Sequence, residues 1–183
     1  LYYRFQAVNH YPFSLGWSES SRYYYGSLVF SKWLYGQIFP LSILHPSRYL
    51  LQSLIFLVPG SDLFLSRVWQ ALLWILLTAV TAYLLPKRIL GHSRLFVAEK
   101  GFRWLLTGWI FLFLLRIGVY YHLEPIVFIP LLASNKTVEW KKAGLLIIAS
   151  VWAGISRVNW FIMPGVLLAL AYVFENSIPN GKR

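Results

Sequence analysis

The stretch LFLSRVWQALLWILLTAVTAYLL, residues 63–85, decides the fold class of this chain. Its 23 residues would rise about 34 Å as an α-helix, enough to cross a hydrocarbon core of about 30 Å. Asp62 stands directly before it and is suited to cap the first turn. Arg67 lies one turn inside, where we expect its side chain to reach back to the membrane surface. The stretch therefore predicts a transmembrane helix.

The composition agrees with a chain that lies largely in lipid. Hydrophobic residues make up 58% of the chain and charged residues 13%, whereas soluble domains carry about 25% charged residues. The absence of cysteine excludes disulfides and thiolate metal sites. The basic residues behind the net charge of +11 lie mostly in short loops, which indicates membrane topology rather than nucleic-acid binding. The bilayer is thus the first predicted partner.

The first part of the chain, residues 1–61, contains no run able to cross a membrane, and we expect it to form an outer loop. Residues 1–25 lack periodicity and should be irregular. Two short helices should follow in the interface, one within residues 26–44 and one from Pro46 to just before Val58. Because the chain opens with neither an initiator Met nor a leader-like run, we expect a fragment that lacks its first membrane helix.

The second part, residues 62–183, is the predicted transmembrane region. The loop after Pro86 is the most basic of the chain, which places it in the cytoplasm. Two further apolar stretches, residues 104–133 and 143–174, are each broken by polar residues near the middle. Each could be a hairpin of two half-helices or one kinked span, and we favour hairpins because they keep all basic flanks in the cytoplasm. The predicted fold class is an all-α, polytopic integral membrane bundle.

Charged residues in the two breaks are candidate substrate-binding residues, because charges inside a membrane are costly. Hairpins would turn both breaks toward the outer loop that carries Glu19 and Arg22. Arginine forks bind phosphate oxygens, and a nearby carboxylate can accept a proton from an attacking hydroxyl. The candidate substrate-binding residues are Arg22 of the outer loop and, in the breaks, Arg116, His122, Glu124, Arg157 and Asn159.

Simpler roles are open for the same side chains. Arg116 could pair with Glu124 as a buried bridge inside the bundle. Arg157 could merely reach the interface, and Glu19 could cap the helix that follows it. The histidines and acidic residues show no metal-ligand spacing, so no metal site or other cofactor is predicted.

The order of these features resembles the membrane glycosyltransferases of the GT-C superfamily. Glu19, within WSESSRYY at residues 17–24, stands where those enzymes place an acidic residue in the first outer loop. Two short interfacial helices and a membrane helix then follow in the same order. Family members often carry two acidic residues in this loop, whereas serines flank Glu19, so the resemblance lends a divalent metal only weak support.

The resemblance implies a function as well as a fold. Glu19 would be the general base on the acceptor, and Arg116 or Arg157 would hold the phosphate that leaves. The donor would be a polyprenyl-phosphate-linked sugar, and transfer would occur at the outer face of a multi-pass protein in a bacterial plasma membrane. A transporter or flippase-like protein without transferase chemistry remains the alternative, since transporters also use broken helices. A membrane assembly subunit without enzymatic activity is a third reading.

Overall fold

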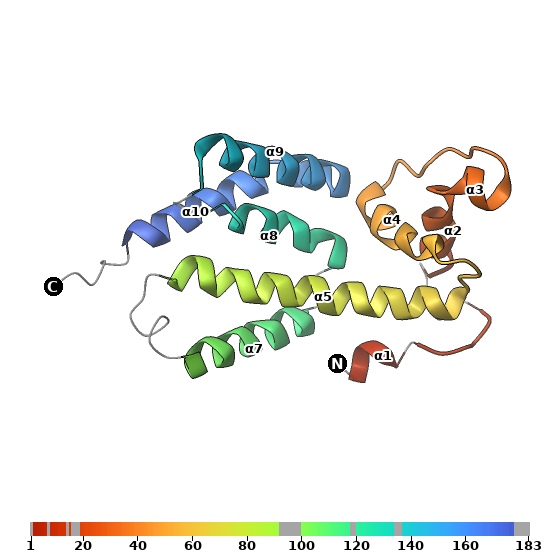
Figure 1. Cartoon of the computed structure of the whole chain (residues 1–183), viewed down its shortest axis with the longest axis horizontal. Helices are drawn as coiled ribbons and strands as arrows, with labels where there is room; N and C mark the ends of the chain where they lie inside the picture. Colours follow the sequence, from red (N-terminus) through yellow and green to blue (C-terminus); the bar gives the residue numbers. More distant parts are fainter. Residues whose placement is uncertain are drawn as a thin grey trace. The chain divides into compact units, whose positions relative to one another are not determined.

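The structure is a computed structural model of the chain. The residues that it describes are 2–6, 8–13, 15, 19–91, 100–117, 120–133 and 137–177. They form helices and connecting segments, and the described ranges contain no strand (Figure 1). The chain divides into two compact units, residues 1–75 and residues 76–183, which are described separately below. The all-helical part of the fold prediction is confirmed.

The first unit is built from short helices and the beginning of a long one. The short helices are α1 (Tyr2–Phe5), α2 (Glu19–Leu28), α3 (Ser31–Tyr35), α4 (Pro46–Ser53) and the 3-10 helix η1 (Leu54–Leu57). The prediction for α4 and η1 is confirmed, with Pro46 in the first turn and Val58 extended after the last.

Two boundary predictions for the first unit are wrong. Helix α1 and the start of α2 at Glu19 both lie inside the stretch expected to be irregular. The single helix expected within residues 26–44 is instead the end of α2 and the five residues of α3. Gly36 ends α3 because its φ of 69° is left-handed, a conformation that glycine adopts without a steric penalty.

Helices α2 and α4 approach each other closely at Gly26 of α2, which has no side chain to keep them apart. A Cβ atom added at Gly26 would lie 3.4 Å from Gln52 Cγ and 3.4 Å from Phe56 Cε2. Phe56 is buried and also meets the ring of Tyr23 edge-on, with the centroids 5.1 Å apart. The contact holds the helix that begins at Glu19 against the helix that precedes α5.

Helix α5 (Leu63–Leu90) has 28 residues, begins in the first unit and continues into the second. The predicted N-cap is confirmed, since the backbone N–H of Leu65 donates to Asp62 Oδ1 at 2.8 Å. The helix runs five residues past the predicted end at Leu85, because Pro86 costs it one backbone hydrogen bond without ending it. Among the described residues, α5 is the one helix that is long and apolar enough to cross a membrane.

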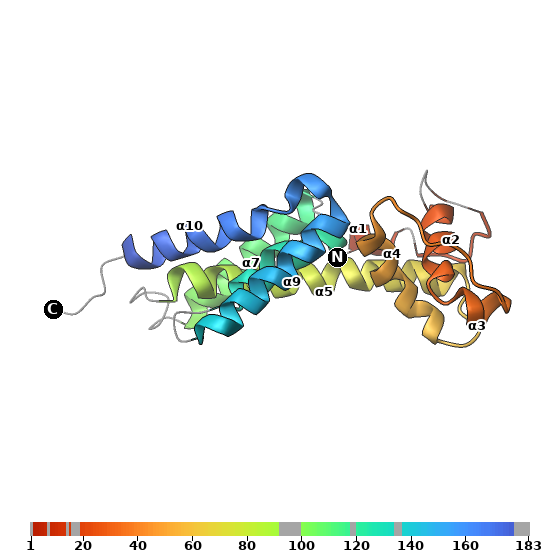
Figure 2. The ribbon, with the colours of Figure 1, turned by 90° about the horizontal axis from the view of Figure 1, so that it is seen from above.

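The second unit contains the two broken stretches. Its helices are α7 (Lys100–Ile117), η2 (Tyr121–Leu123), α8 (Glu124–Leu131), α9 (Glu139–Ser156), η3 (Val158–Trp160) and α10 (Met163–Ser177). Helix α8 runs opposite to α7, and α10 runs opposite to α9 (Figures 1 and 2). Each broken stretch therefore starts and finishes at the same end of this unit.

The core of the second unit lies where α8, α9 and α10 pack together. Leu123, Ile126 and Ala153 are buried there, and the indoles of Trp152 and Trp160 cover them. Small residues on α9 allow the close approach, since Ala149 and Ala153 have no exposed surface.

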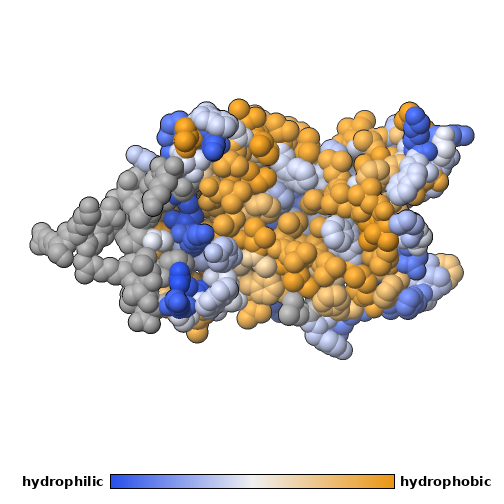
Figure 3. Space-filling view, viewed as in Figure 1, coloured by the Kyte–Doolittle hydropathy of each residue, from blue (hydrophilic) through white to orange (hydrophobic). Residues whose placement is uncertain are grey.

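Large apolar side chains also cover much of the outside. Hydrophobic residues, drawn in orange, dominate the described surface on the face shown in Figure 3. None of the described side chains of α7 is buried, although the helix is rich in Leu, Phe and Trp. Exposed apolar surface of this extent is rare on soluble monomers and marks contact with lipid or another protein.

Candidate functional site

An arginine of α5 and a glutamate of α2 form a buried ion pair in the first unit. Arg67 Nε donates to Glu19 Oε1 at 2.7 Å, and Arg67 Nη2 donates to Glu19 Oε2 at 3.2 Å. Arg67 is 4% exposed and Glu19 is 7% exposed. The prediction that Arg67 reaches the membrane surface is therefore wrong, because a buried carboxylate holds its guanidinium inside the unit.

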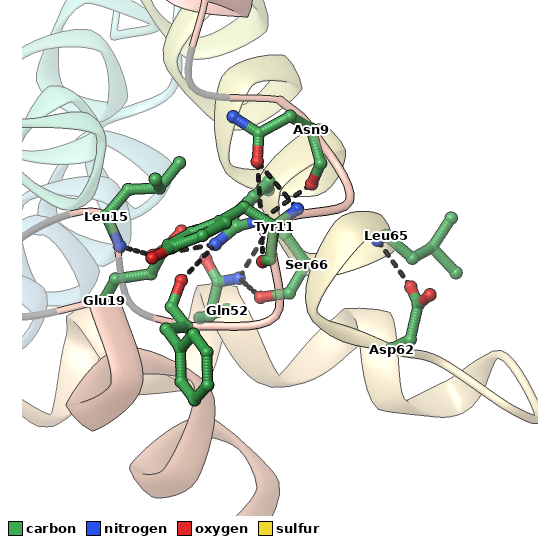
Figure 4. A network of polar contacts seen from close by, with 10 residues as sticks. Asn9, Tyr11, Leu15, Glu19, Gln52, Asp62, Leu65 and Ser66 are labelled. Carbon is green, nitrogen blue, oxygen red and sulfur yellow. Dashed lines mark hydrogen bonds and ion pairs between the residues drawn. The ribbon is translucent and has the colours of Figure 1, made fainter.

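The same guanidinium binds the segment that precedes α2, and Figure 4 labels Asn9 and Tyr11 of that segment beside Glu19. Arg67 Nη1 donates to the carbonyl oxygens of Asn9 and Tyr11, both at 2.7 Å, and to Asn9 Oδ1 at 3.0 Å. Arg67 Nη2 donates to the carbonyl oxygen of Phe13 at 2.9 Å. These carbonyl groups lie outside helices and need partners, so one side chain satisfies three of them. Arg67 thus positions Glu19 and residues 8–13 together.

Glu19 accepts a third hydrogen bond, from the backbone N–H of Leu15 to Oε2 at 2.6 Å. Burial alone would raise the pKa of Glu19, but the bonds from Arg67 and Leu15 and the charges of Arg67 and Arg22 outweigh it and lower the pKa. The carboxylate is thus held ionised. The capping alternative is wrong, because Glu19 lies within α2 and bonds Leu15 and Arg67 instead of the N–H groups that follow it.

A second polar contact ties α4 to the same turn of α5. Gln52 Nε2 donates to Ser66 Oγ at 2.8 Å and to the Ser66 carbonyl oxygen at 3.2 Å, and Gln52 is fully buried. Since Ser66 directly precedes Arg67, α2 and α4 are both fastened to one turn of the long helix. The sequence analysis did not predict the contact between Gln52 and Ser66. The two consecutive polar residues Ser66 and Arg67 in an otherwise apolar turn could have indicated it.

In the second unit, Glu124 faces α5 rather than a basic residue. It is 1% exposed, and Thr78 Oγ1 donates to its Oε1 at 3.3 Å. Thr81, one turn further along α5, lies near the same carboxyl group, and its hydroxyl donates to the carbonyl oxygen of Leu77 at 3.2 Å. Arg116 lies exposed at the end of α7 and makes no ion pair with Glu124, so the buried bridge considered for this pair is wrong.

The two breaks of the second unit lie side by side. Trp152 Nε1 of α9 donates to the carbonyl oxygen of His122 at 2.8 Å, and His122 is buried. Helix α9 ends at Ser156, and Arg157 follows in an extended conformation with φ −157° and ψ 121°. Arg157 and Asn159 are both exposed.

The structure thus sorts the predicted site residues into three groups. Glu19 and Arg22 belong to the first unit, where their charges interact. His122 and Glu124 are buried inside the second unit. Arg116, Arg157 and Asn159 are exposed at the breaks of the second unit. Convergence of the two units on one site stays a prediction.

No group of three or more metal-binding side chains of His, Asp or Glu gathers within the described ranges. Comparison of the chain with protein-family models, with curated proteins and with solved structures found no match.

Proposed function

We propose that this chain is part of a membrane-embedded transferase that moves a sugar from a polyprenyl-phosphate donor to an acceptor. The observation that carries the proposal is the buried pair of Glu19 and Arg67. It joins the acidic position of α2 to the first turns of α5, the helix of membrane length, with α3, α4 and η1 between them. This is the order that the resemblance to GT-C enzymes implies.

The surfaces and lengths of the other helices support placement of the second unit in a bilayer. Helices α7 and α9 have 18 residues each, about 27 Å of rise, which is close to a hydrocarbon core of about 30 Å. Their charged residues lie in the terminal turns, and α7 has no buried side chain among those described. Contact of these apolar surfaces with water is unfavourable, whereas contact with lipid tails carries no such cost.

In this proposal Glu19 accepts the proton of the acceptor hydroxyl as that oxygen attacks the sugar. Its Oε2 already accepts two hydrogen bonds, but Oε1 accepts one and retains a lone pair. The lowered pKa keeps the carboxylate ionised, as a base must be, while making it a weaker base. Arg67 would hold the base in place without touching the substrate.

The residues of the second unit take different roles in the proposal. Arg116 and Arg157 are exposed, so their guanidinium groups are accessible to the phosphate of the donor. His122 and Glu124 are buried, so they would hold the breaks in position and would not contact the sugar. The developing negative charge on the leaving phosphate is what the arginines would stabilise.

Two variants that break the same ion pair test the role of Glu19. Transfer of a radiolabelled hexose from a polyprenyl-phosphate carrier would be measured in membranes that contain the protein. We expect Glu19→Gln to lower transfer at least about 100-fold, because the base is lost. Arg67→Gln keeps the carboxylate and should retain a measurable part of the rate.

The control is Glu139→Gln, which removes a carboxylate from an exposed pair with Lys142 and should leave transfer unchanged. Equal losses in Glu19→Gln and Arg67→Gln, both with normal membrane insertion, would show that the pair is structural. Full transfer by Glu19→Gln would remove Glu19 as the base. Movement of the carrier lipid across the membrane without sugar transfer would favour a transporter.

A further inference from the structure

A basic cavity lies between the end of α5 and the start of α7 in the second unit. Its volume is about 250 Å³. Lys87 comes from the last turns of α5, and Arg103 comes from the first turn of α7. The residues that line it are Tyr83, Lys87, Arg103, Trp104 and Thr107.

The chemistry of the lining fits an anionic phosphate group. Lys87 and Arg103 supply two positive charges, Thr107 supplies a hydroxyl, and none of the described lining residues is acidic. Lys87 Nζ lies 5.2 Å from the centroid of the Tyr83 ring, a cation–π contact that keeps the ammonium beside the cavity. An arginine and a lysine that converge on one cavity form a common type of phosphate site.

The position of the cavity along α5 favours a lipid as the source of this phosphate. Lys87 follows Leu63 by 24 residues, about 36 Å along the helix, so it would lie at the level of the headgroups if α5 crosses the bilayer. Trp104 and Tyr83 are residue types that collect at this level.

The surface of α7 beyond the cavity supplies a place for acyl chains. Trp104, Phe111 and Leu115 recur at helical spacing on the side of α7 that also carries Arg103 and Thr107, and Phe111 and Leu115 are partly exposed. This apolar stripe begins at Trp104 and runs away from the first turn of the helix. A free phosphate ion would leave the stripe uncovered, whereas a phospholipid would cover both the cavity and the stripe.

We propose that this cavity binds the phosphate of an anionic phospholipid, whose acyl chains lie along α7. The proposal rests on the membrane placement of the proposed function but not on its transfer chemistry, and nothing in it involves Glu19. Basic pockets between membrane helices on the cytoplasmic side are suited to such headgroups.

The test measures lipid retention by the whole chain in detergent, using native mass spectrometry with equimolar phosphatidylglycerol and phosphatidylcholine. We expect the chain to retain phosphatidylglycerol preferentially. The double variant Lys87→Gln/Arg103→Gln should lower this preference at least about fivefold. The matched control, Lys32→Gln/Lys141→Gln, removes the same charge from exposed positions outside the cavity and should keep the preference.

Several results would overturn the proposal. One is a control variant that loses the preference for phosphatidylglycerol as much as the double variant does, and another is an unmodified chain that shows no preference. A third is displacement of the lipid by 10 mM inorganic phosphate, which would assign the site to a free ion. If the double variant fails to fold, Thr107→Glu decides, because it adds a negative charge to the cavity and keeps both cations. Retained preference in Thr107→Glu contradicts the proposal, and loss supports it.

Discussion

Arg67 of α5 donates to both carboxylate oxygens of Glu19 of α2, a residue 48 positions earlier in the chain. Both side chains are almost completely buried. Each charge of this ion pair depends on the other, because removal of one partner would leave the other buried without compensation. The pair also connects three backbone carbonyl groups of residues 9–13 to the long helix.

Removal of either partner should therefore destabilise the first unit. We expect Glu19→Gln and Arg67→Gln each to cost about 3 kcal/mol, since each leaves a buried group of the pair uncompensated. Thermal unfolding of the purified chain, followed with proteolysis near residues 9–13, would measure this loss. Lys142→Gln is the control, because it breaks an exposed pair with Glu139 worth about 0.5 kcal/mol. Equal small effects in all three variants would contradict a structural role for the buried pair.

The pair should also make stability depend on pH in the acid range. Burial alone would raise the pKa of Glu19, but its bonds from Arg67 and Leu15 lower the pKa below the usual 4.5. The ionised form therefore favours the folded state, and its contribution is complete above about pH 4.5. It is lost as the pH falls through the lower pKa of the folded state. The thermal midpoint between pH 7 and pH 3 should fall less in Glu19→Gln than in the unmodified chain, and parallel profiles would contradict this.

The contact between α2 and α4 should tolerate one methyl group but not a large side chain. At Gly26 an added Cβ meets Gln52 and Phe56 at 3.4 Å, so Gly26→Ala should be close to neutral or slightly stabilising. Gly26→Leu should cost about 2 kcal/mol, because the branched side chain would separate the helices. Thermal unfolding would rank the two variants. A neutral Gly26→Leu would show that the helices are not held at this distance.

Cysteine labelling should distinguish the hairpins from kinked spans. The chain has no cysteine, so single substitutions can be labelled without background. Leu44→Cys and Val138→Cys lie at exposed positions of the first and second units. A membrane-impermeant maleimide added outside intact cells should label Leu44→Cys and should label Val138→Cys only after permeabilisation. Labelling of Val138→Cys in intact cells would replace the hairpins with single spans.

Local sequence signals were reliable where a short segment decides its own conformation. Asp62 predicted a cap and makes one, and Pro46 predicted the start of α4. Both signals act within one turn, through a side-chain acceptor or a restricted φ, so no distant residue is needed. The end of α5 was missed because a proline near a helix end removes one hydrogen bond, and the turns around it can outweigh that loss.

The candidate site was only partly predictable, because its contacts join residues that are far apart in the sequence. Glu19 was singled out, but its partner Arg67 was assigned to the membrane surface, and Glu124 was weighed against Arg116 instead of Thr78. The two threonines of α5, Thr78 and Thr81, are three residues apart and share one helix face, which is the signal that could have indicated a buried polar partner.

The sequence by itself determined the helical class, the cap and start of two helices, and the position of the one described helix of membrane length. These features depend on hydropathy, on length and on interactions within a single turn. Only the tertiary structure decided which charges meet. Arg67 meets Glu19, and Glu124 meets Thr78, because the helices that carry them pack together. Helix packing decides which side chains far apart in the sequence meet, and their spacing along the sequence does not predict these pairs.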